Sequence, residues 1–216
     1  MTARTIIMVP ADARPDSGSA LRLVRLHLES RRVTAALVTV VACALTLRIA
    51  LRWSWDTYGA LQLPLILESG CAAAIGITTG SPFGEPERAT GKWLPLLRLG
   101  SAITMTATAV IAFAVATLGA DLAGGIADVV RNVVGLVGIA LLCAALLGGG
   151  LAWTGPVVYM IVGAYGLYTD WHPPAITSPW IWPARPPLDL GAALCAATVF
   201  AAGIAAVTWR GARESA

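Results

Sequence analysis

Long apolar runs separated by short polar connections dominate the chain from residue 33 onward. A helix needs about 20 predominantly apolar residues to cross the hydrocarbon core of a bilayer. Runs of about this length recur along the chain. They predict an all-α, polytopic bundle of about six transmembrane helices, near residues 33–53, 58–79, 94–119, 129–147, 152–168 and 188–209.

The connection between the fourth and fifth runs decides the number of spans. It consists of Gly148, Gly149 and Gly150 and is almost as apolar as the helices that it joins. A turn at this point gives six spans and places both ends of the chain on one side. A single bent helix would leave five spans and move the C-terminus across the membrane.

Two segments precede the first span. Residues 1–18 are rich in Asp, Pro, Ser and Gly, a composition typical of a mobile tail. Residues 19–32 predict an amphipathic helix whose basic stripe includes Arg22, Arg25 and Arg32. Such a helix suits the cytoplasmic membrane surface, although an extension of the first span is the alternative. Residues 33–216 form the predicted transmembrane domain.

Composition and charge support a membrane protein and orient it. The chain is 57% apolar and 12% charged, whereas soluble domains carry about 25% charged residues. A net charge of +3 is too small to indicate a nucleic-acid partner. Basic residues gather on the cytoplasmic side of membrane proteins. With six spans and a cytoplasmic N-terminus, the outside carries only Arg48, Arg52, Arg131 and Arg185, and the other Arg and Lys residues lie inside.

The tryptophans predict two interfacial belts and an unusual external segment. Trp93, Trp153 and Trp209 are expected at the inner interface. Residues 170–187, DWHPPAITSPWIWPARPP, are rich in Pro and Trp and are expected to lie outside as an interfacial or re-entrant element. The outer belt is predicted to comprise Trp53, Trp55, Trp171, Trp180 and Trp182.

Catalytic chemistry has little support in the sequence. The four cysteines lie inside apolar runs without a CxxC pair, and neither histidine has partners at metal-ligand spacing. The stretch from Gly84 to Lys92 has six residues between its glycines and Trp93 after its lysine, so it does not match a phosphate-binding loop. We therefore expect no enzyme activity, no metal and no cofactor.

One carboxylate, Glu68, lies well inside a predicted span, where charge is costly and usually paired or functional. At about 1.5 Å per residue, Glu68 lies roughly 15 Å below the outer end of the second span. Arg48 lies roughly 8 Å below the outer end of the first span. The favoured interpretation is an intramembrane ion pair between Arg48 and Glu68. A role in transport or proton movement, and a permanently protonated Glu68, are the alternatives.

Small residues are expected to let helices approach closely. Gly76 and Gly80 form a GxxxG match in the second span, and Gly135 and Gly138 lie one turn apart in the fourth.

The polar connection at residues 81–92 is the most informative one. It follows a Ser-Pro break, carries Glu85, Glu87 and Arg88, and precedes a helix start that contains Pro. A plain solvated loop is one interpretation. The sharper one is a docking surface for a cytoplasmic partner.

The order of these elements is similar to that of a known family. The chain resembles the membrane subunit of type-2 (ABC-2-like) ATP-binding cassette exporters. The shared order is a basic amphipathic helix, two spans, a short acidic cytoplasmic loop, three spans, an external segment and a last span. The segments at 81–100 and 131–148 are similar to small actinobacterial permeases of this kind. The chain departs from the family in being short, with almost no external domain.

The resemblance implies a translocation pathway formed with a second membrane subunit in a bacterial plasma membrane. It also implies that the loop with Glu85, Glu87 and Arg88 docks a separate ATPase subunit, and that both termini are cytoplasmic. Membrane lipid is the remaining expected partner. The alternatives are a membrane enzyme acting on a lipid-linked substrate and an accessory subunit without a pathway of its own.

Overall fold

The computed structural model describes residues 33–53, 57–80, 93–120, 125–168 and 178–210. These residues form an all-helical bundle without strands, as the apolar pattern predicts. The predicted tail at 1–18, the amphipathic helix at 19–32 and the loop at 81–92 lie outside the described residues. The helices are α2 (Val33–Ala50), α3 (Thr57–Thr78), α5 (Trp93–Thr117), α6 (Gly125–Leu147), α7 (Thr154–Tyr168) and α8 (Leu190–Arg210), with the short 3-10 helices η1 (Gly149–Leu151) and η3 (Trp182–Ala184).

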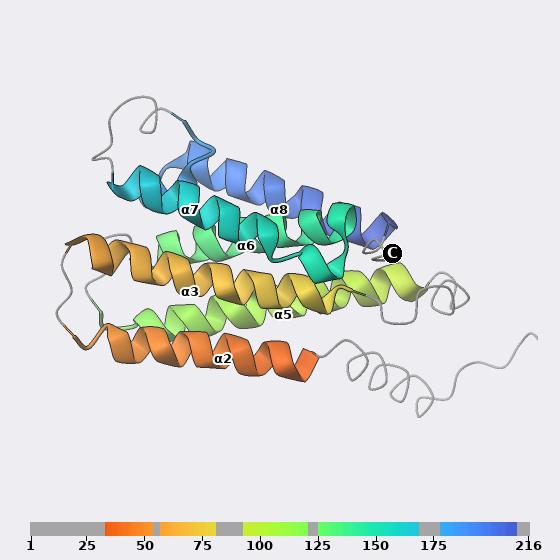
Figure 1. The fold of residues 1–216 in the computed structure, drawn as a ribbon, viewed down its shortest axis with the longest axis horizontal. Helices are drawn as coiled ribbons and strands as arrows, with labels where there is room; N and C mark the ends of the chain where they lie inside the picture. Colours follow the sequence, from red (N-terminus) through yellow and green to blue (C-terminus); the bar gives the residue numbers. More distant parts are fainter. Residues whose placement is uncertain (1–32, 54–56, 81–92, 121–124, 169–177, 211–216) are drawn as a thin grey trace, which may run out of the picture.

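The helices run side by side and reverse direction at each connection (Figure 1). The first residue of α2 and the last residue of α8 therefore lie at one end of the bundle, which we call the near end (Figure 1). The starts of α3, α6 and α8 lie at the opposite end, which we call the far end. This alternation matches the predicted arrangement, in which the first and last helices begin and end on the same side.

The helices have the length and composition of a multi-pass membrane protein. Five described stretches are long and apolar enough to cross a bilayer: Val33–Ala50, Pro95–Thr117, Gly125–Leu147, Gly149–Leu167 and Leu190–Arg210. The remaining helix, α3, has 22 residues and runs alongside the others, and its described apolar part is the shorter stretch Gln62–Thr78.

A true turn separates the fourth and fifth predicted spans. Helix α6 ends at Leu147, and Gly148 follows with φ 100°, a conformation that side chains other than glycine rarely adopt. One turn of 3-10 helix then leads into α7, which runs back along the bundle (Figure 1). The structure therefore has two helices here rather than one long bent helix.

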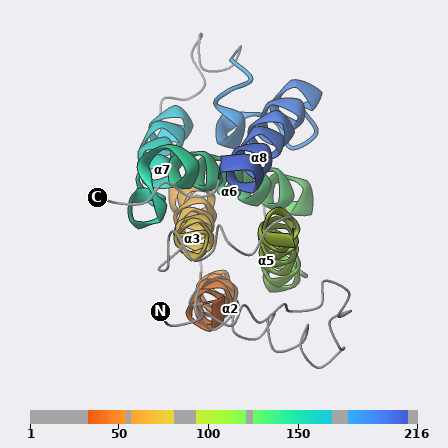
Figure 2. The same ribbon diagram turned by 90° about the vertical axis from the view of Figure 1, so that its right-hand side faces the viewer.

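Helix α6 lies at the centre of the bundle. It packs against α3, α5, α7 and α8, and its interface with α8 is the most extensive of all (Figure 2). Helix α2 lies at the edge, against α3 and α5. The side chains of Val133, Leu136, Val137 and Leu141 on α6 are fully buried and form the middle of the core.

Glycines allow the central helices to approach closely, as the sequence predicts. A Cβ atom at Gly138 would lie 2.6 Å from the backbone nitrogen of Phe200 on α8, and one at Gly203 would lie 2.5 Å from the carbonyl oxygen of Gly138. On the other side of α6, a Cβ atom at Gly76 would lie 2.9 Å from the Cβ of Ala140. Packing at these points therefore requires the absence of side chains.

The exposed tryptophans lie at both ends of the helices. Trp53 and Trp180 are exposed at the far end, and Trp153 and Trp209 are exposed at the near end. These four positions agree with the predicted belts. Trp182 does not, because it is only 2% exposed and is part of the protein core.

We expect Gly138→Ala to destabilise the bundle by about 1–3 kcal/mol, since the new methyl group meets backbone atoms of α8 that cannot move aside alone. Thermal unfolding in detergent or nanodiscs measures the effect. Gly100→Ala on α5 is the matched control, because nothing lies within 4 Å of a Cβ atom there. Equal stability of the two variants would contradict the close α6–α8 contact.

Candidate functional site

Arg48 does not pair with Glu68. Its guanidinium Nη1 donates to the carbonyl oxygens of Leu118 at 2.5 Å and Ala116 at 3.3 Å, at the far end of α5. The last carbonyl groups of a helix lack partners within the helix and carry partial negative charge, so a cation there is favourable. The predicted intramembrane pair is therefore wrong, and Arg48 instead joins α2 to α5.

Glu68 is fully buried on α3, facing α6. Neither of its carboxyl oxygens makes a hydrogen bond of good geometry with the described residues. The side-chain amide of Asn132 on α6 is close enough to interact with the carboxyl group, and Asp128 and Arg131 act on it electrostatically. The oxygen Oδ1 of Asn132 is also buried without a partner.

The prediction of an Arg48–Glu68 pair is wrong for a geometric reason. The estimate from sequence used only depth along the helix axis, and depth does not say which neighbour a side chain faces. The neighbouring polar side chains of Glu68, including Asn132, lie on α6 and not on the preceding helix. The sequence signal for this polar region was the spacing of Asp128, Arg131 and Asn132 in an otherwise apolar run.

Two arginines and two aspartates hold the far ends of α6 and α8 together. Arg131 makes an ion pair with Asp128 one turn earlier on α6. Its Nη1 also donates to the carbonyl oxygen of Pro186 at 2.7 Å, and its Nη2 to that of Arg185 at 3.2 Å. Arg185 makes an ion pair with Asp189. The charges balance within this group, so its main effect is to fix the start of α8 against α6.

Asp189 is the N-cap of α8. Its Oδ1 accepts a hydrogen bond of 2.9 Å from the backbone N–H of Ala192, which the helix itself leaves without a partner. This hydrogen bond, followed by the interaction with Arg185, holds the pKa of Asp189 below its usual range. The carboxylate is therefore ionised at neutral pH and supports both the cap and the ion pair.

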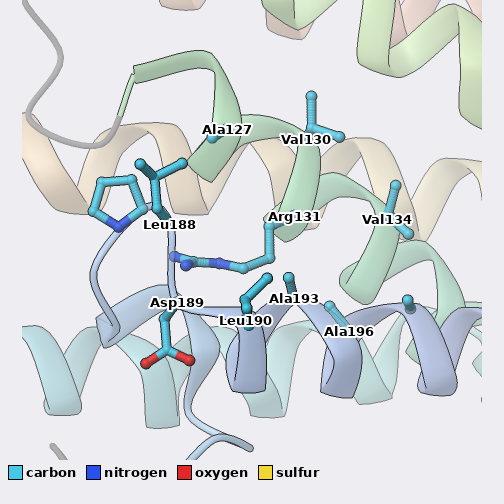
Figure 3. Close-up of a pocket in the computed structure, with 11 residues that line it drawn as sticks. Ala127, Val130, Arg131, Val134, Leu188, Asp189, Leu190, Ala193 and Ala196 are labelled. Atoms are coloured by element: carbon cyan, nitrogen blue, oxygen red, sulfur yellow. The ribbon is translucent and has the colours of Figure 1, made fainter.

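A groove of about 460 Å³ runs between α6 and α8 beside this charged group. Small apolar residues such as Ala127, Val130 and Ala193 form its walls. Figure 3 shows the side chain of Arg131 crossing from α6 toward Leu188, while the carboxylate of Asp189 points away. The groove is thus an apolar surface whose two charged residues, Arg131 and Asp189, are already paired with Asp128 and Arg185.

The Pro- and Trp-rich segment between α7 and α8 enters the bundle at the far end. Ile181, Trp182, Pro183 and Ala184 are buried, and the η3 turn packs against α6, α7 and α8. The turn at residues 181–184 is therefore inserted between the helices, whereas Trp180 and Leu188 on either side of it are exposed. The part at 169–177, including His172, lies outside the described residues.

Tyr159 on α7 anchors the inserted segment. Its ring stacks on the Trp182 ring with a centroid separation of 4.3 Å. Its hydroxyl donates to the carbonyl oxygen of Trp180 at 2.7 Å and accepts from the backbone N–H of Trp182 at 3.2 Å. Gly135 on α6 makes room for the indole, because a Cβ atom there would lie 2.5 Å from the Trp182 ring. An irregular backbone is tolerated at membrane depth only when its polar groups are satisfied in this way.

The remaining predicted site residues are not placed. Glu85, Glu87 and Arg88 lie outside the described residues, so the docking surface stays a prediction. Among the described residues, no three His, Cys, Asp or Glu side chains lie close enough together to hold a metal ion.

In comparisons with known proteins, no family model, curated protein or solved structure matches this chain.

We expect Tyr159→Phe to lower the stability of the bundle by about 1 kcal/mol, since it removes the hydroxyl that joins Trp180 and Trp182 while keeping the ring stack. Tryptophan fluorescence during thermal unfolding reports the loss. Tyr165→Phe on the same helix is the control, because Tyr165 is 69% exposed. If Tyr159→Phe behaves like this control, the hydroxyl does not anchor the segment.

Proposed function

We propose that this chain is a transmembrane subunit of an ATP-binding cassette exporter, driven by a separate cytoplasmic ATPase subunit. The observation that carries the proposal is the order of elements along the bundle. Two helices, a polar connection at 81–92, three helices, an inserted segment and a last helix follow one another in the order that the resemblance implies.

The geometry of the bundle supports the 81–92 connection as the docking surface. It joins the end of α3 to the start of α5, and both of these helix ends lie at the near end (Figure 1). A partner bound to this connection would act on two helices at once. Helix α3 packs directly against α6, so a movement of α3 would reach the centre of the bundle.

The packed centre of the bundle favours a pathway between two membrane subunits. Helix α6 is covered by four other helices, and its inward side chains fill the core. A solute would therefore cross along the outer surface of this bundle, against a second copy or a related permease. Membrane lipid would cover the remaining exposed apolar faces.

The near end is the cytoplasmic end in this proposal, and the membrane is the bacterial plasma membrane. The basic residues of the N-terminal segments, of the 81–92 connection and of the C-terminus then lie inside, which accords with the preference of Arg and Lys for the cytoplasmic side.

We expect Glu85→Lys combined with Glu87→Lys to weaken ATPase binding at least about tenfold, or to uncouple ATP hydrolysis from transport. Two charge reversals oppose complementary contacts across an interface, and like charges brought together there cost several kcal/mol. The measurement is ATPase retention on the purified membrane subunit, with transport in reconstituted vesicles. Arg88→Glu should act in the same direction if Arg88 also contacts the partner.

Glu214→Lys is the control for this experiment, because it reverses an acidic residue that follows α8 in the sequence and lies outside the loop. Normal partner retention and transport by the double variant would contradict the docking assignment. A soluble chain that co-purifies but is no ATPase would contradict the exporter.

The proposed orientation has its own test. In a variant without the four native cysteines, we expect a single cysteine at position 85 to be protected in intact cells from an impermeant thiol reagent. A cysteine at position 180 should be labelled, since Trp180 is exposed at the far end. Labelling at 85 without labelling at 180 would reverse the orientation.

A further inference from the structure

The contact between α3 and α6 contains buried polar atoms that lack hydrogen-bond partners among the described residues. Both oxygens of Glu68 and the Oδ1 of Asn132 are buried, and none has a partner among the described residues. Buried polar atoms in proteins are nearly always hydrogen-bonded, because an unpaired one costs roughly 1–3 kcal/mol. In the interior of a membrane protein, water is not freely available to supply the missing donor.

One additional proton on Glu68 supplies this donor. A carboxylic acid and a primary amide form two parallel hydrogen bonds when they face each other, with the acid O–H donating to the amide oxygen and the amide N–H donating to the acid carbonyl oxygen. An ionised Glu68 is an acceptor only and leaves Oδ1 of Asn132 unpaired. The side-chain amide of Asn132 is close enough to donate to the carboxyl group, which is one of the two hydrogen bonds of such a pair.

Among the described residues, the cations nearest Glu68 make other hydrogen bonds. The Nη atoms of Arg131 bind Asp128 and two backbone carbonyl groups, its Nε is buried without a partner, and Arg48 is bound to α5. The titratable and charged side chains on α3 and on the described helices against it are Cys71 on α3, Cys43 and Arg48 on α2, Arg98 on α5, Asp128, Arg131 and Cys143 on α6, and Tyr159 and Tyr165 on α7.

A polar route leads from this pair to the far end. Asp128 precedes Asn132 by four residues on α6, so the two side chains lie on the same face of the helix. The Asp128 side chain is 19% exposed, whereas Glu68 is fully buried. A proton can therefore pass between the aqueous far end and Glu68 through Asp128, while Arg131 balances the charge of the Asp128 carboxylate.

We propose that Glu68 is a reversible proton-binding site whose bound state is the acid–amide pair with Asn132, reached from the far end along α6. When the O–H bond of Glu68 breaks, the proton leaves through Asp128 to water. The carboxylate that remains needs water or a new donor, so proton release loosens the α3–α6 contact. This proposal does not depend on the exporter function.

Infrared spectroscopy of the purified chain in nanodiscs tests the protonation directly. At neutral pH we expect one C=O band of a buried carboxylic acid, lost completely in Glu68→Gln, which keeps the shape and hydrogen-bonding capacity of the side chain. Asn132→Ala should shift the band, since the acid loses its partner. Asp189→Asn is the matched control and should leave the band unchanged, because the carboxylate of Asp189 is ionised and paired with Arg185.

Raising the pH should remove the band in the wild-type chain. A band that is unchanged in Glu68→Gln, or absent from the wild-type chain at neutral pH, would overturn the proposal. A band that persists at every pH at which the bundle remains folded would overturn reversible binding.

A double-mutant cycle tests the partner independently of spectroscopy. Glu68→Ala and Asn132→Ala should show non-additive losses of stability, because each removes the same pair. Glu68→Ala and Arg48→Ala should show additive losses, since Arg48 binds α5. The opposite pattern would restore the ion pair and overturn the acid–amide pair.

Discussion

The close contact between α6 and α8 is the constraint on which the rest of the bundle depends. Gly138 and Gly203 bring the two backbones together, with no space for a side chain at either position. In lipid, helices gain little from the hydrophobic effect when they associate, so tight packing and polar contacts must hold them. Here the glycines supply the packing, and Arg131 supplies the polar contact at the far end.

The two faces of α6 have different roles. One face receives α8 and the Trp182 indole, for which Gly135 leaves space. The other face receives α3, with Gly76 against Ala140 and Glu68 near Asn132. Arg131 lies between these regions, lining the groove beside α8 while acting electrostatically on Glu68. A movement of α3 or of α8 against α6 would therefore affect the packing on the opposite face of α6.

The sequence predicted the helices well because length and apolarity decide membrane spans locally. It also indicated Gly76, Gly135 and Gly138 as positions of close helix packing, since that depends on residue type. It left open whether Gly148 begins a turn or lies in a bent helix, and the structure shows a turn. It did not predict the partner of Glu68 or the burial of Trp182. Both depend on which helices become neighbours in three dimensions, and the spacing of residues along one helix does not contain that information. The same limit applies to Arg48, whose partners lie at the end of α5.

Thiol cross-linking in native membranes tests the α6–α8 contact most directly. In a variant without native cysteines, Val134→Cys on α6 and Ala197→Cys on α8 place two thiols in the same groove between these helices, within reach of a short bifunctional thiol reagent. The structure predicts cross-linking of this pair and none of Val134→Cys with Leu45→Cys, since Leu45 is exposed on the peripheral helix α2. Cross-linking to position 45 in place of position 197 would contradict the arrangement of the bundle.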